Sequence, residues 1–200
     1  MTEGFLGVSQ LLTPKTTLSA TFTFGAEDGY LNDPYRLATF DTFGFAFHEQ
    51  RPANKTKEVF LLSLTQYIQP LHAGVEGSYR FYHDSWDVYA QTAMLTWRQW
   101  LGKHFLLEPR FRYTQQSAAY FYGASFPGIT PPDKGYFSAD YRLSRMQTFD
   151  YGLQATVKPV NWLRLIVGYY RYEMYGLDNI TASAMYPKAN VFTGSMQLWW

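Results

Sequence analysis

The sequence predicts an all-β protein: an antiparallel, up-and-down transmembrane β-barrel with about nine to ten strands in this chain. Three observations predict this fold. Apolar and polar residues alternate along much of the chain, with the period of two that is typical of a β-strand. Aromatic residues make up 20% of the chain and charged residues only 16%, which is below the roughly 25% of an ordinary soluble domain. Short turns also alternate with long loops, as they do in outer-membrane barrels.

The clearest strand pair lies between residues 86 and 122. In its second strand the apolar residues share one parity: Phe105, Leu107, Phe111 and Tyr113. The opposite parity is polar: Glu108, Arg110, Arg112, Thr114 and Gln116. Such a charged face is poor material for a soluble core, but it suits a barrel whose charged face lines the lumen while the apolar face meets lipid.

The length of the turn around Gly102 determines which charged residues of the two strands lie on the same face of the sheet. We expect Leu95 and Trp97 to point outward and Arg98 inward, on the face that carries Glu108. This arrangement requires a turn of odd length. Pro109 interrupts the second strand and has no N–H to donate, so we expect a local bulge there.

The other strands follow the same alternation. Before the central pair they are expected at residues 4–12, 16–24, 58–69 and 73–83, and after it at 148–157, 163–175 and 190–200. Short turns are expected near residues 13, 70, 102 and 159. Proline or glycine stands in or beside each of these turns, as turn geometry favours.

Long outer loops are expected at about residues 25–55, 118–145 and 176–189, all on the side opposite the short turns. The middle of the first loop, residues 37–48, is aromatic enough to form a local hairpin. Together these elements make residues 1–200 a single barrel domain, expected in the bacterial outer membrane.

The beginning of the chain lacks two features that a complete outer-membrane barrel has. MTEGFLGVSQ contains no basic region followed by an apolar core, so it is not a signal peptide. About nine strands are expected, whereas a single-chain bacterial barrel closes with an even number. We therefore expect this chain to be a fragment that has lost an N-terminal part.

The end of the chain has the pattern of an assembly signal. Its apolar residues share one parity: Phe192, Gly194, Met196, Leu198 and Trp200. A final alternating strand that ends on an aromatic residue is similar to the signal by which the barrel assembly machinery recognises its clients. The alternative is an ordinary edge strand.

Several of these segments also resemble a known family. They are GVSQLLTPKTTLSATFTF, GYLNDPYR, GSYRFYHDSWDVYAQTAMLTWRQWLG and EPRFRYTQQSAAYFY. From about residue 4 to residue 200 the chain is similar to the C-terminal part of a family of Gram-negative outer-membrane barrels known only as a domain of unknown function. The resemblance implies the fold and the location. It supplies no catalytic residues.

The charged residues expected to line the lumen are Glu76, Arg80, Arg98, Glu108, Arg110, Arg112, Asp150 and Arg164. Two interpretations remain open for this set. The side chains line a pore with a positive bias that favours anions, or they pair across a narrow lumen and fill it, because interior charges need partners.

The function expected from these features is passive, porin-like transport or a structural role in the envelope, without catalysis. Outer-membrane lipid, the assembly machinery and small solutes are the expected partners. A net charge of +1 gives no reason to expect nucleic acid. The sequence contains no cysteine and no HExxH spacing, and we expect neither a metal nor another cofactor.

Two alternatives were weighed against this function. The first is a membrane-embedded hydrolase acting on lipid or peptide. His83, Asp84 and Ser85 have suitable residue types, but adjacent residues of one hairpin do not reach triad geometry with each other. The second is a soluble, lipocalin-like binding barrel, with the aromatic parity inside.

Two aromatic clusters are expected to form the outer aromatic girdle: residues 120–122, and Tyr169, Tyr170, Tyr172 and Tyr175. A platform for stacking sugars is the alternative function for them.

Overall fold

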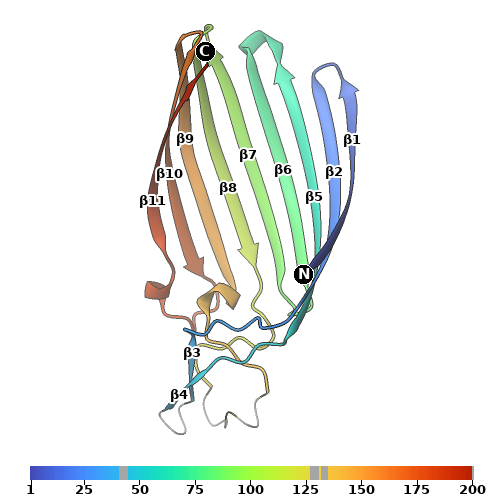
Figure 1. Cartoon of the computed structure of the whole chain (residues 1–200), viewed down its shortest axis with the longest axis vertical. Coiled ribbons are helices and arrows are strands. Elements are labelled where there is room, and N and C mark those ends of the chain that lie inside the picture. Colours follow the sequence, from blue (N-terminus) through green and yellow to red (C-terminus); the bar gives the residue numbers. More distant parts are fainter. Residues whose placement is uncertain (41–44, 127–130, 132–134, 200) are drawn as a thin grey trace.

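The protein is one curved antiparallel sheet of nine strands with folded loops at one end (Figure 1). The computed structural model describes residues 1–40, 45–126, 131 and 135–199. The sheet strands are β1 (Thr2–Thr13), β2 (Thr16–Asp28), β5 (Asn54–Ile68), β6 (Ala73–Asp84), β7 (Tyr89–Leu101), β8 (Phe105–Gln116), β9 (Met146–Val160), β10 (Leu163–Gly176) and β11 (Lys188–Leu198). Each strand pairs with the next sheet strand along the chain, so the predicted antiparallel, up-and-down order is confirmed.

The sheet keeps two free edges, β1 and β11. No pairing within the part of the chain that the structure describes joins these two strands. None of the described residues forms a helix that is long and apolar enough to cross a membrane.

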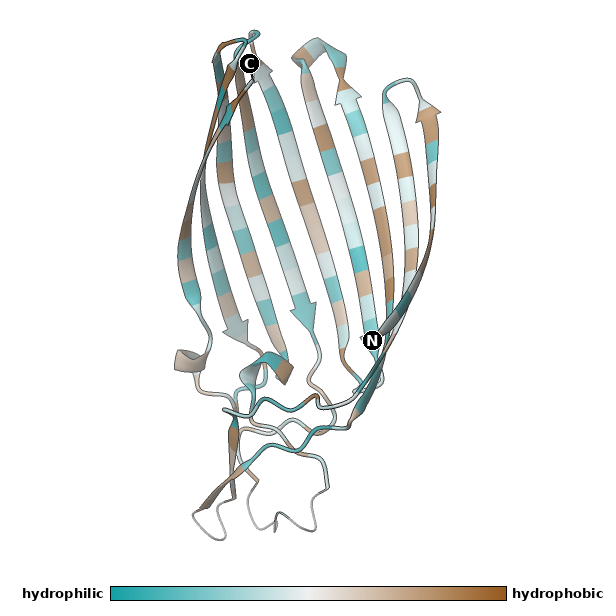
Figure 2. Ribbon diagram, in the orientation of Figure 1, coloured by the Kyte–Doolittle hydropathy of each residue, from teal (hydrophilic) through white to brown (hydrophobic). Residues whose placement is uncertain are grey.

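The two faces of the sheet differ in polarity, as the alternation along each strand in Figure 2 shows. Thr92, Thr96 and Thr156 on the polar face are 6–8% exposed. On the apolar face, Leu95 is 52% exposed and Phe111 is 45% exposed. Because side chains crowd together on the inside of a curve and spread apart on its outside, we call the polar face concave and the apolar face convex.

The two ends of the sheet differ as the sequence predicts. Tight connections join strands at one end, between β1 and β2, β5 and β6, β7 and β8, and β9 and β10. At the other end the long connections cover residues 29–53, 117–145 and 177–187. The first and third are shorter than expected because the strands beside them extend further, and the second is as expected. The N-terminus lies near the loop end, and the C-terminus lies at the turn end (Figure 1).

The bulge predicted at Pro109 is wrong. Thr96 lies opposite Arg110 and Gln99 lies opposite Leu107, so the register of β7 and β8 is the same on both sides of the proline. On its other side Pro109 stays in register with Leu153. The hydrogen-bonded pairing of β7 and β8 is only interrupted between these two pairs, as expected where proline lacks an N–H.

The long loops fold into a cap of their own. The predicted hairpin in the first loop is present as β3 (Leu37–Phe40) and β4 (Phe45–His48). Its Phe40 packs against Phe126 and Phe137 of the second loop. The second loop reaches the third, where Ser144 Oγ and Tyr186 Oη are 2.8 Å apart. Aromatic packing therefore joins the first and second loops, and a buried hydrogen bond joins the second and third.

The prediction that residues 120–122 belong to an outer girdle is wrong. β8 ends at Gln116, before this cluster begins. Phe121 is 2% exposed and packs edge-on against Trp86, with ring centroids 5.3 Å apart. The cluster lies in the second loop, where Phe121 forms part of the core of the cap.

Candidate functional site on the concave face

All the charged residues predicted to line the lumen lie on the concave face. The register places Glu76 opposite Thr96 and Thr96 opposite Arg110, so β6, β7 and β8 present their charges on one side. Arg112 lies opposite Asp150, which extends this face to β9. The odd-length turn predicted at Gly102 is correct, because Arg98 and Glu108 share this face and contact each other.

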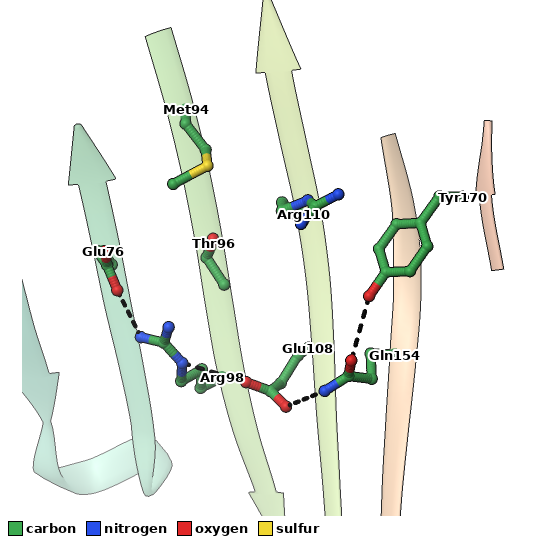
Figure 3. A pocket seen from close by; sticks show the side chains of 8 residues that line it. All are labelled: Glu76, Met94, Thr96, Arg98, Glu108, Arg110, Gln154 and Tyr170. Atoms are coloured by element: carbon green, nitrogen blue, oxygen red, sulfur yellow. Dashed lines mark hydrogen bonds and ion pairs between the residues drawn. The ribbon is translucent and has the colours of Figure 1, made fainter. Parts of the chain in front are cut away.

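A continuous row of polar contacts, the polar belt, crosses this face (Figure 3). Arg98 donates to Glu76 at 2.8 Å and to Glu108 at 3.1 Å. Glu108 accepts a hydrogen bond from Gln154 at 3.0 Å, and Gln154 accepts one from Tyr170 at 3.2 Å. The belt runs from β6 to β10 and lines a cavity of about 230 Å³.

Gly152 allows Tyr170 to complete this belt. The two residues lie opposite each other on β9 and β10. A Cβ on Gly152 would lie 2.4 Å from Cδ1 of Tyr170. The ring therefore lies flat across the glycine, as aromatic residues do beside glycines in sheets. This position brings the tyrosine hydroxyl to Gln154 and places the ring 4.6 Å below the Arg110 guanidinium.

The carboxylates of the candidate set are all paired. Glu76 and Glu108 bind Arg98, and Asp150 binds Arg110 at 2.9 Å. Pairing therefore neutralises all three carboxylates, whereas the remaining arginines lie towards the two ends of the face.

Arg164 lies at the turn end. It donates to Gln197 at 3.1 Å, and its guanidinium is 5.1 Å from the ring centre of Trp199. No carboxylate pairs with it among the described residues.

Arg80 and Arg112 lie towards the loop end and line a second cavity, of about 250 Å³. Arg80 lies over the ring of Tyr82, at 5.2 Å. Arg112 makes no ion pair with any carboxylate in the described part of the chain, and neither does Arg80.

The second loop closes over this end of the face. The short 3₁₀ helix η2 (Tyr141–Leu143) contributes Arg142 and Leu143 to the wall of the second cavity. The side chain of Gln116 holds it in place by donating to the backbone carbonyls of Arg142 and Ser144, at 2.8 and 3.0 Å. Part of the site therefore comes from the loop cap.

Asp140 anchors this helix through charge. Burial disfavours its charged form, but hydrogen bonds from Arg142 outweigh this effect and hold the pKa of Asp140 below its ordinary value. Arg142 also binds Asp33 at 2.8 Å. A backbone hydrogen bond from Tyr35, together with Arg142, holds the pKa of Asp33 below its usual range. The cluster joins the first and second loops.

His83, Asp84 and Ser85 point to different partners. His83 stacks on Tyr89 with ring centroids 4.4 Å apart. Asp84 is 2% exposed and accepts hydrogen bonds from the backbone N–H groups of Trp86 and Val88. These bonds shape the turn between β6 and β7. Among the described residues, no group of three or more His, Cys, Asp or Glu side chains could hold a metal ion.

The predicted C-terminal signal lies on the free edge strand β11. Phe192 lies opposite Tyr169 with ring centroids 5.0 Å apart, and Met196 lies opposite Leu165. Gly194 and Leu198 share the convex face with them. Trp200 lies outside the described residues.

The sequence analysis missed some residues of the site. Gln154 is absent from the predicted set, although it shares the parity of Asp150 on the same strand and this parity could have indicated it. Tyr170 was grouped with the outer girdle, and that prediction is wrong because Tyr170 lies on the concave face. Arg142 had no signal in the sequence, since only the folding of the loop brings it to the cavity.

Comparison with known proteins gives a family and a fold. A family model described as "Protein of unknown function (DUF3570)" matches residues 1–192. Two solved structures of OmpT, an in-vitro folded outer membrane protein of Vibrio cholerae, resemble the chain with a TM-score of 0.63. Their sequence identities are 11% for the trimer form and 12% for the other. Each match covers 98% of this chain and 56% of the OmpT chain.

This chain thus spans about half the length of those structures. No curated protein matches it. The family model covers nearly the whole chain, and the sequence resemblance to a family of unknown function is therefore confirmed: the chain belongs to the DUF3570 family.

Proposed function

We propose that this chain is part of a porin-like β-barrel in the bacterial outer membrane, and that small hydrophilic solutes pass through it without catalysis. The observation that carries this proposal is the difference between the two faces of one sheet. The convex face exposes large apolar residues such as Leu95 and Phe111, and the concave face carries the polar belt. Transmembrane barrels have this arrangement, with apolar residues towards lipid and polar residues towards the lumen.

The likeness to OmpT supports the fold of this proposal. OmpT is an outer membrane protein, and we propose the same location for this chain. Barrel closure then requires that further strands pair with β1 and β11, since open sheet edges do not occur in the hydrocarbon region. The assembly machinery would recognise β11 through its convex parity.

A structural barrel that does not conduct is the second candidate. The polar belt favours it, because Arg98 bridges two carboxylates across the concave face. Such a network can fill a narrow lumen. If the lumen is open, the arginines that lack a carboxylate partner give it a positive bias and a preference for anions.

Planar bilayer recordings distinguish these candidates. The protein, together with the strands that close its barrel, is first folded in detergent, and folding is checked by circular dichroism and by a shift between boiled and unboiled samples on a gel. We expect steps of conductance, and in a KCl gradient we expect a reversal potential of the sign that chloride selectivity gives. A folded, heat-modifiable protein that stays electrically silent would refute the pore and favour the structural barrel. A β-rich protein that is stable without detergent would refute both.

A further inference from the structure

We propose that Arg80 and Arg112 form a binding site for a soluble phosphate-bearing solute at the loop end of the concave face. This site rests on the proposed function only in that the concave face must be in contact with water. Both arginines line the same cavity of about 250 Å³. They lie on β6 and β8, on either side of β7.

Neither arginine has a carboxylate to neutralise it, although two carboxylates lie close. Asp84 is fully engaged: it accepts from Tyr82 at 2.6 Å and from Lys55 at 3.0 Å. Backbone N–H groups of Trp86 and Val88 occupy its second oxygen. Asp84 therefore has no free oxygen for Arg80.

Asp150 lies opposite Arg112 in the register but binds Arg110 instead. The loop arginine Arg142 is likewise engaged, with Asp140 and Asp33. Within the described part of the chain, the guanidinium groups of Arg80 and Arg112 donate no hydrogen bond.

The neighbouring polar groups add hydrogen-bond donors. Thr92 lies opposite Arg80, and its hydroxyl is 3.1 Å from the hydroxyl of Thr114. When one hydroxyl donates to the other, the second keeps a free proton for a ligand. A cavity with two free guanidinium groups and a hydroxyl donor suits a phosphate group, which arginine binds in a bidentate manner.

The proposed occupant is a soluble compound and not a lipid headgroup. Both arginines belong to the parity of the concave face, whereas the apolar residues of the same strands point to the convex face. The cavity of about 250 Å³ has room for a phosphate group and a small organic part.

Titration calorimetry of the folded protein in detergent, with inorganic phosphate as the probe, tests this site. The test variant is R80Q/R112Q, and R164Q is the matched control because Arg164 lies on the same face but at the turn end. We expect phosphate to bind in competition with excess chloride. We expect R80Q/R112Q to weaken the affinity about tenfold or more, the effect of losing about 1.4 kcal/mol, and R164Q to leave it unchanged.

Equal affinities of the unaltered protein and R80Q/R112Q would overturn the site, because the two arginines would then take no part in binding. A weaker affinity in R164Q would also overturn it, because binding would then follow net charge alone. Absence of phosphate binding by the unaltered, heat-modifiable protein would also overturn it. Displacement of the phosphate by mixed micelles that contain phosphatidic acid would overturn the assignment to a soluble compound. Conductance is a separate measurement, so a silent barrel that still binds phosphate would refute the pore and leave this site intact.

Discussion

Arg98 on β7 and Glu108 on β8 face each other across the hairpin at Gly102, with Nε and Oε1 3.1 Å apart. Arg98 also holds Glu76 on β6. One guanidinium thus neutralises carboxylates from both neighbouring strands, and this double contact is the centre of the polar belt.

Removing Arg98 should destabilise the sheet. In R98Q both carboxylates lose their cation and repel each other, so we expect a loss of about 1.5–3 kcal/mol, the range for hydrogen bonds to charged groups. Urea unfolding in detergent, followed by tryptophan fluorescence, measures the loss. The control is R98Q/E108Q, which also removes one of the two unpaired carboxylates. We expect part of the lost stability to return in this variant. A double variant that is less stable than R98Q would contradict the role given to this pair.

Gly152 should not tolerate a side chain. A Cβ at this position would lie 2.3 Å from the carbonyl oxygen of Tyr169 and would push the Tyr170 ring away. We expect G152A to cost about 1–3 kcal/mol, as overpacking does. G77A is the control, because a Cβ on Gly77 has no atom within 4 Å. The same unfolding measurement compares the two. Equal stability of G152A and G77A would show that the tyrosine does not lie across the glycine.

The loop cap should depend on Phe121 and not on its neighbour Tyr120. Phe121 is 2% exposed against Trp86, whereas Tyr120 is 54% exposed. We expect F121A to destabilise the cap by about 3–5 kcal/mol, the usual cost of truncating a buried phenylalanine. Limited proteolysis should then cut residues 117–145 faster in F121A than in Y120A. Identical cleavage rates in the two variants would refute the packed cap.

Acid should loosen the cap. The pKa of Asp33 and that of Asp140 are lowered in the folded protein, so both groups stabilise it above their unfolded pKa of about 3.9. This stabilisation is lost as the pH falls from that value through the lower folded pKa values. Proteolysis by pepsin, compared between pH 5 and pH 2.5, should show faster cleavage of the loops at the lower pH. D140N should be cleaved readily at both values. A cap in D140N that is as resistant as the unaltered one would contradict the prediction.

The sequence predicted the sheet well because a strand's faces follow from a period of two. An odd-length turn at Gly102 places Arg98 and Glu108 on the same face of the sheet, and their contact could be predicted from this. The bulge at Pro109 was wrong because the ladder can lose one hydrogen bond without a change of register. Grouping Tyr170 with Tyr169 in one aromatic cluster misplaced it, because neighbouring residues of a strand point to opposite faces.

The contacts within the loop cap could not be predicted from the sequence, for a different reason. Its contacts join residues far apart in the chain, such as Arg142 and Asp33. No repeat or spacing records these contacts, because they depend on how the loops pack. The half of the phosphate site that comes from β6 and β8 could be predicted from parity, whereas the wall formed by η2 could not.

The central claim is that the convex face meets lipid and the concave face meets water. The sequence has no cysteine, so L95C and S78C each carry a single site for a fluorescent label, on the convex and concave face respectively. The measurement is quenching of the label by brominated lipid, with the protein folded into vesicles. The account predicts strong quenching of the label in L95C and little in S78C. Equal quenching at both sites, or none in L95C, would contradict it.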